Sequence, residues 1–156
     1  MRIFLVAGLV LSGATAMASL VADVRQAVAR NDFAAAEMHL EAASQITARL
    51  GCSREQVLCL FSRGELLHER GRLEEALRHY DQALEMARQI APEGDMVHEL
   101  QRRRAEVFTQ RGEAPQARAA AEDALSRSIR LKDHLEEGAT RRVLAAIETL
   151  DAHPIE

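Results

Sequence analysis

The sequence is poor in aromatic residues and in helix breakers. Aromatic residues make up 3% of the 156 residues, tryptophan is absent, and only three prolines occur. Sheet proteins rely on aromatic and β-branched residues, which are sparse after residue 30. The apolar 47% is mostly Ala and Leu, accompanied by Glu, Arg and Gln, all of which favour helix. The composition therefore predicts an all-α protein of one domain, since a domain usually takes roughly 100–200 residues.

An excess of basic charge is also missing. The formal net charge is -4 and the isoelectric point is about 5.9. Nucleic-acid-binding domains usually carry a basic excess, so no nucleic-acid partner is expected. The arginine run at 102–104 is local, and Glu99 and Glu106 flank it, which is typical of a solvated helix face.

Motifs for catalysis and metal binding are absent from the sequence. It contains no C-x-x-C pair, glycine-rich phosphate loop or G-x-S-x-G. His68-Glu69 lacks the second histidine of the zinc motif H-E-x-x-H. Cys52 and Cys59 would lie about 10 Å apart along one helix, too far for a disulfide. We therefore expect free thiols, no cofactor, no metal site and no enzymatic activity.

Residues 1–18 have the features of a secretory leader. Met1-Arg2 precedes nine apolar residues at 3–11, and Ala16-Met17-Ala18 fits the A-x-A cleavage pattern. This predicts a signal peptide cut before Ser19, and therefore a periplasmic protein. Two alternatives stay open. Positions 3–22 carry no charge, so the segment could remain as a membrane anchor, or it could be an extra apolar helix packed on the first repeat of a cytoplasmic protein.

The chain repeats itself at a fixed interval, which is the signature of a repeat architecture. The hexapeptides N-D-F-A-A-A, G-R-L-E-E-A and G-E-A-P-Q-A start at residues 31, 71 and 112, so the intervals are 40 and 41 residues. The same offsets relate two columns of alanines. These columns are Ala36, Ala76 and Ala117, and then Ala43, Ala83 and Ala124.

Each unit has the pattern of two helices. In the second unit, Ser53 to Gln56 forms a capping box, and Gly71 can turn the chain because glycine tolerates positive φ. Ala91-Pro92-Glu93-Gly94 ends the unit, and Asp95 can cap the next helix. We predict repeats at about 19–50, 53–91 and 95–132, a capping helix at 134–150 and a tail at 151–156.

This spacing resembles the tetratricopeptide repeat family, in the longer variety found in bacterial signalling and transcription-activator proteins. The resemblance covers roughly residues 20–150. The second unit carries it best, at Leu60, Gly64, Leu67, Gly71, Leu73, Ala76, Tyr80, Ala83 and Leu84. The resemblance implies a right-handed α-solenoid of stacked hairpins, whose first helices line a concave groove that binds peptides or proteins.

Transferring the family's groove positions gives a candidate partner-binding set. It consists of Arg25 from the first unit, Phe61, Glu65, His68 and Glu69 from the second, and Arg102, Arg103, Glu106 and Gln110 from the third. The mixed charges would suit a partner segment that carries both signs. The competing interpretations are plain solvation for the charged residues and a place between repeats for Phe61.

Two functions are compatible with this pattern. The first is a non-catalytic adaptor that binds a protein or peptide partner in the groove. The alternative is a detached sensory or regulatory module that acts with a transcription activator or signalling kinase in the cytoplasm. Self-association is a further expectation, because the ends of a solenoid expose apolar surface unless they are capped. Contact with a membrane is expected only if the N-terminal segment stays as an anchor.

Overall fold

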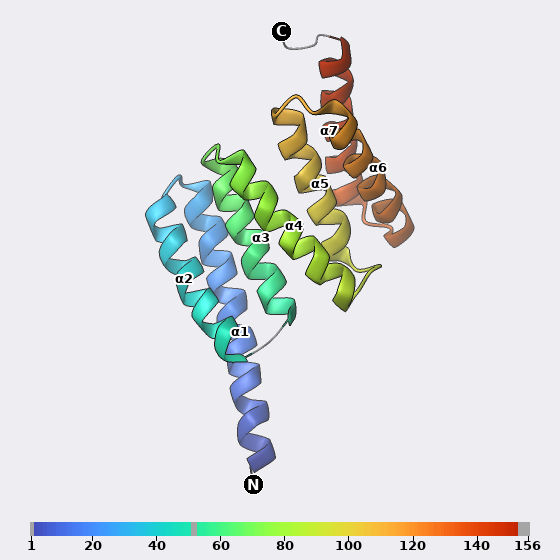
Figure 1. Ribbon diagram of the computed structural model, residues 1–156. Helices are drawn as coiled ribbons and strands as arrows, with labels where there is room; N and C mark the ends of the chain where they lie inside the picture. The colour runs from blue at the N-terminus through green and yellow to red at the C-terminus, as the bar shows by residue number, and fades with distance from the viewer. Residues whose placement is uncertain (1, 51–52, 153–156) are drawn as a thin grey trace.

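The computed structural model describes residues 2–50 and 53–152, with side chains from residue 15 onward except at positions 50, 53 and 151. In these residues the chain forms seven α-helices and no strand, which confirms the all-α prediction (Figure 1). The helices are α1 (Arg2–Ala29), α2 (Phe33–Leu50), α3 (Ser53–Glu69), α4 (Leu73–Ile90), α5 (Asp95–Gln110), α6 (Ala114–Leu131) and α7 (His134–Ala152).

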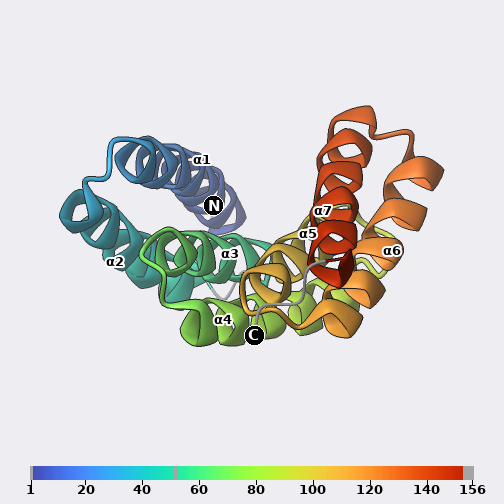
Figure 2. The ribbon, with the colours of Figure 1, turned by 90° about the horizontal axis from the view of Figure 1, so that it is seen from above.

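Consecutive helices pair into hairpins that stack side by side. The helices α1 and α2, α3 and α4, and α5 and α6 pack on each other, while α7 packs on both α6 and α5. Seen from above, the hairpins follow a curve with α1, α3, α5 and α7 on its inner side and α2, α4 and α6 on its outer side (Figure 2). The structure is therefore an α-solenoid in which the first helix of each hairpin faces inward.

The turns inside the hairpins share one backbone geometry. Asn31, Gly71 and Gly112 have φ values of 57°, 72° and 74°, in the left-handed region. Each is followed by a residue whose N–H bonds back across the turn, as from Arg72 to the carbonyl of Leu67 at 2.9 Å. This is the Schellman arrangement that ends many helices. The repeated hexapeptides align these three positions, and the three share this turn geometry.

The core is built between hairpins as well as within them. Three clusters of buried residues are described, and each contains side chains from one hairpin and from the next helix along the chain. The alanines at the start of the outer helices, Ala36, Ala76 and Ala117, are fully buried. A methyl group at these positions allows close approach of the paired helices. Stacking therefore supplies the core, as expected of repeat proteins.

Tyr80 of α4 packs directly on Gly64 of α3. Tyr80 is fully buried, and a Cβ atom added at Gly64 would lie only 2.5 Å from its Cε1. Phe61 packs against the same ring with a centroid distance of 6.0 Å. The absence of a side chain at Gly64 therefore creates the space that the tyrosine ring occupies.

The helix α1 begins much earlier than the sequence pattern suggested. The first repeat was expected to begin at about residue 19, after the leader, but α1 runs from Arg2 through Ala29 without a break. No proline interrupts this stretch, so nothing in it ends the helix. Met17 is 1% exposed and belongs to the core cluster that α1 forms with α2 and α3. A cut before Ser19 would remove this core side chain, and the cut itself stays a prediction.

Three smaller expectations can be compared with the structure. The residue that precedes α5 is Gly94, so Asp95 lies one position inside the helix, where its Oδ1 accepts the N–H of Met96 at 2.9 Å. Cys59 is a buried free thiol, whereas Cys52 lies outside the described residues. Within the part of the chain that is described, no helix is both long enough and apolar enough to cross a membrane.

Candidate partner-binding groove

A pocket of about 540 Å³ lies between the inner helices α1, α3 and α5. Five of the nine predicted groove residues line it, namely Arg25, Glu65, His68, Glu69 and Arg103. These residues come from three different repeats, so stacking of the hairpins brings them together.

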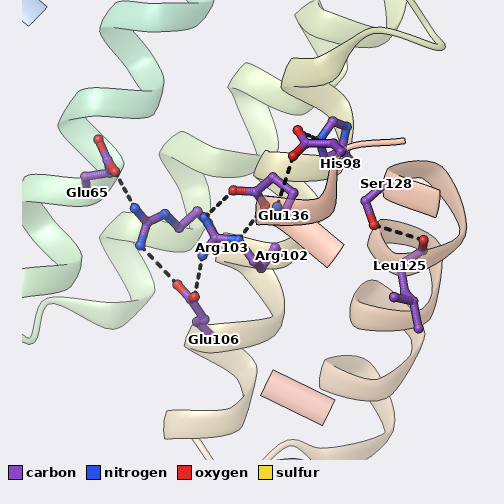
Figure 3. Close-up of polar contacts among 9 residues, drawn as sticks. Glu65, His98, Arg102, Arg103, Glu106, Leu125, Ser128 and Glu136 are labelled. Atoms are coloured by element: carbon purple, nitrogen blue, oxygen red, sulfur yellow. Dashed lines mark hydrogen bonds and ion pairs between the residues drawn. The ribbon is translucent and has the colours of Figure 1, made fainter. Parts of the chain in front are cut away.

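An ion-pair chain crosses the floor of this groove. Glu65 of α3 lies between two arginines: Arg103 of α5 donates to its Oε1 at 2.6 Å, and Nε of Arg25 on α1 lies 3.6 Å from its Oε2. Figure 3 shows the Arg103 side chain reaching Glu65 on one side and Glu106 on the other. Burial opposes the charge of Arg103, but the carboxylates of Glu65 and Glu106 raise its pKa above the ordinary value. The charges of Arg25 and Arg103 are thus paired with carboxylates of the same chain.

The chain continues from the groove to α7. Arg102 donates to Oε1 of Glu106 at 2.5 Å and to both carboxylate oxygens of Glu136, at 2.6 and 3.1 Å (Figure 3). Arg102 is only 7% exposed. Asp133 accepts the N–H of Glu136 at 3.1 Å and so caps the start of α7. Arg102 therefore links α5 to α7 through Glu136, while Glu106 contacts Arg102 and Arg103 within α5, and neither Arg102 nor Glu106 lines the pocket.

Phe61 lies beneath the groove and not on its surface. Its ring is fully buried, and the guanidinium carbons of Arg25 and Arg103 lie 5.9 and 6.0 Å from the ring centroid. Such positions are favourable cation–π contacts. Phe61 is therefore a core residue and not part of the groove surface. Its ring lies beneath the two arginine side chains.

His68 and Gln110 form a separate contact at one end of the groove. The amide of Gln110 donates to Nε2 of His68 at 2.8 Å, and the His68 ring meets the Tyr80 ring edge-on at a centroid distance of 6.4 Å. His68 is buried, while Gln110 is exposed. The histidine is thus fixed in place by two neighbours. Among the described residues, no group of three or more His, Cys, Asp or Glu side chains could hold a metal ion.

Six residues that the sequence did not assign to the groove also line the pocket, and Tyr80 and Glu99 are among them. Glu99 stands four residues before Arg103, so both lie on one face of α5, and this spacing is the signal that could have revealed it. Burial, together with the charges of Glu136 and Glu65, raises the pKa of Glu99 above its ordinary value. Tyr80 is a core residue that also lines the pocket.

Several polar groups at the pocket lack partners among the described residues. The buried atoms Tyr80 Oη, Glu65 Oε2 and Arg103 Nε have no hydrogen-bond partner. Glu69 and Glu99 have neither a hydrogen bond nor an ion pair within the described part of the chain. Buried polar groups are nearly always satisfied. The pocket therefore holds both donor and acceptor capacity that the described residues leave unused.

The hairpin array and its inner groove define the chain as a helical-repeat protein. Residues 14–89 match the family described as Tetratricopeptide repeat, so this part of the chain consists of tetratricopeptide repeats, and the stacked hairpins continue beyond it. Repeats of this family generally mediate protein–protein interaction and are generally not catalytic.

One solved structure has a similar fold. The crystal structure of BtubC (BKLC) from P. vanneervenii superposes with a TM-score of 0.73 at 19% sequence identity. The match covers 96% of this chain and 65% of that chain, so the present chain spans about two thirds of the length of its structural neighbour. At this identity the likeness concerns the fold alone. No curated protein sequence matches the chain.

Proposed function

We propose that the protein is a non-catalytic adaptor that binds a peptide segment of a partner protein in the groove between α1, α3 and α5. The observation that supports this most is the pocket of about 540 Å³, which exposes unpaired acidic groups above a floor of buried, unsatisfied polar atoms. An extended peptide carries hydrogen-bonding groups along its whole length and could satisfy such a surface. The groove lies on the rigid inner helices, so it exists before the partner binds.

Selection from a random peptide display library against the full-length protein tests this proposal. A matched pair of variants locates the binding. Glu69→Arg changes an exposed groove residue without a partner in the described chain, and Gln82→Arg places the same new charge on the exposed surface of the outer helix α4. Selected peptides should bind the Gln82→Arg protein like the wild type and the Glu69→Arg protein at least about tenfold more weakly. If no selected peptide distinguishes the two variants, the groove is not the binding site.

The regulatory alternative is favoured by a different observation. Because Met17 is a core residue of the first hairpin, the fold described here uses a side chain that cleavage before Ser19 would remove. Retention of residues 1–18 as a packed helix, and not as a membrane anchor, would suit a cytoplasmic protein, which as a sensory module could meet a transcription activator or kinase. The intact mass of the protein from separated cell fractions decides this point. A mass that begins at Ser19 in an exported fraction would exclude the cytoplasmic module.

A further inference from the structure

We propose that the groove binds the guanidinium group of an arginine side chain of the partner, between Glu65, Glu69 and Glu99. This inference rests on the proposed peptide-binding function and names the side chain that the pocket accepts.

The first support is the balance of charge around the pocket. Two arginines and three glutamates line it, and the single carboxylate of Glu65 contacts both Arg25 and Arg103. Glu69 and Glu99 make no hydrogen bond or ion pair within the described part of the chain, although Arg25 and Arg102 lie close enough to Glu99 to attract its charge. Glu99 is half-buried, and an unpaired carboxylate that is partly removed from water raises the free energy of the protein. A cation from the partner would offset this cost.

The second support comes from the buried polar atoms at the pocket floor. The fully buried Tyr80 lines the pocket, and its Oη has no hydrogen-bond partner among the described residues. The ring is wedged against Gly64 and Phe61, so it cannot turn away to find one. Glu65 Oε2 is likewise buried without a hydrogen bond. Both atoms therefore have unused acceptor capacity, which a donor that reaches the bottom of the pocket could use.

Guanidinium fits this arrangement better than other charged groups. It presents five N–H donors in a planar fork, whereas the ammonium of lysine is a point charge with three. The pocket offers several acceptors from different directions, namely the carboxylates and the tyrosine hydroxyl. An acidic side chain is disfavoured because Glu69 and Glu99 would repel it, while Arg25 and Arg103 are already paired with acids.

The test uses a small probe in place of the unidentified partner. Blocked arginine (N-acetyl-L-arginine N-methylamide) is titrated into the full-length ¹⁵N-labelled protein, with blocked citrulline, lysine and glutamate as comparisons. Citrulline has nearly the shape of arginine but no charge. We expect arginine to shift the amide signals of α3 and α5 around Glu65 and Glu99, and to bind at least about fivefold more tightly than lysine or citrulline. Equal shifts with arginine and citrulline would overturn the proposal.

Variants that keep the shape of the side chain then locate the interaction. Glu99→Gln should weaken arginine binding about tenfold, as expected for loss of one charge-assisted contact. Glu85→Gln is the control, because Glu85 is exposed on the outer helix α4, and it should leave the affinity unchanged. Unchanged affinity in the Glu99→Gln protein contradicts the proposed site.

The peptide selection separates failure of this inference from failure of the proposed function. Peptides that depend on the groove and are enriched in arginine support both. Groove-dependent peptides without such enrichment overturn only the arginine site. The absence of any groove-dependent peptide overturns the adaptor function, and the arginine site with it.

Discussion

Replacing Gly64 with alanine should destabilise the protein, although alanine is the better helix former. The added Cβ would lie 2.5 Å from Cε1 and 2.6 Å from Cδ1 of Tyr80, a ring that is fully buried. Alanine gains about 1 kcal/mol over glycine in a helix interior, whereas overpacking a core costs about 1–3 kcal/mol. A contact this short with a confined ring favours the upper part of that range. We therefore expect a net loss of about 1–2 kcal/mol.

Gly138→Ala is the matched control, because it makes the same substitution on α7 where space is available. The nearest atom to a Cβ at Gly138 is Nη1 of Arg142 at 3.9 Å, so the variant should gain about 1 kcal/mol from helix propensity alone. Urea unfolding followed by circular dichroism at 222 nm measures both changes. In thermal unfolding, 1 kcal/mol corresponds to about 2–4 °C for a chain of this size. If Gly64→Ala stabilises the protein as Gly138→Ala does, Tyr80 does not pack on Gly64 and the α3–α4 register is wrong.

Three further changes test other parts of the structure. Ala76→Leu places a larger side chain at a fully buried position in the first turn of α4. The free energy of unfolding should fall by about 1–3 kcal/mol. An unchanged urea midpoint would contradict the hairpin alignment. Met17→Ala should lower the free energy of unfolding of the full-length chain by about 2–5 kcal/mol. Met38→Ala, at a side chain that is 64% exposed, should lower it by less than about 0.5 kcal/mol. Equal effects of the two substitutions would mean that Met17 is not in the core. Glu99→Gln should stabilise the protein near pH 7, because the raised pKa of Glu99 means that the folded state favours the uncharged form. That advantage should shrink as the pH falls toward the ordinary carboxyl pKa of 4.5 and below. Glu137→Gln should instead destabilise the protein near pH 7, since the hydrogen bonds from Arg141 lower the pKa of Glu137. If both variants change the free energy of unfolding in the same direction, measured as a function of pH, this reasoning is refuted.

Only part of the groove lining could be predicted from the sequence. The transfer of family positions found Glu65, His68 and Arg103, because residues on one face of a helix follow from its 3.6-residue period. It also placed Phe61 and Arg102 in the groove, although both are buried. The depth of a side chain depends on the neighbouring hairpin, and the partner of Arg102, Glu136, lies 34 residues away on α7.

The leader pattern illustrates the same limit at the N-terminus. Ala16-Met17-Ala18 fits a cleavage site by composition alone, and the same residues form helix without strain. Only the packing of α1 against α2 and α3 places Met17 in a core. The pattern of small and apolar residues is shared by a leader and by a buried helix, so the sequence does not separate them.

The sequence by itself determined the helices from α2 onward, the turns and the register of the repeat. These depend on interactions between residues that are close along the chain: helix propensity, the left-handed turns at Asn31, Gly71 and Gly112, and the recurring alanines. The tertiary structure alone decided which polar groups stay unpaired. Glu99 and the hydroxyl of Tyr80 meet in one pocket because the hairpins stack and curve, and whether a charge finds a partner depends on distances between repeats that no local pattern contains.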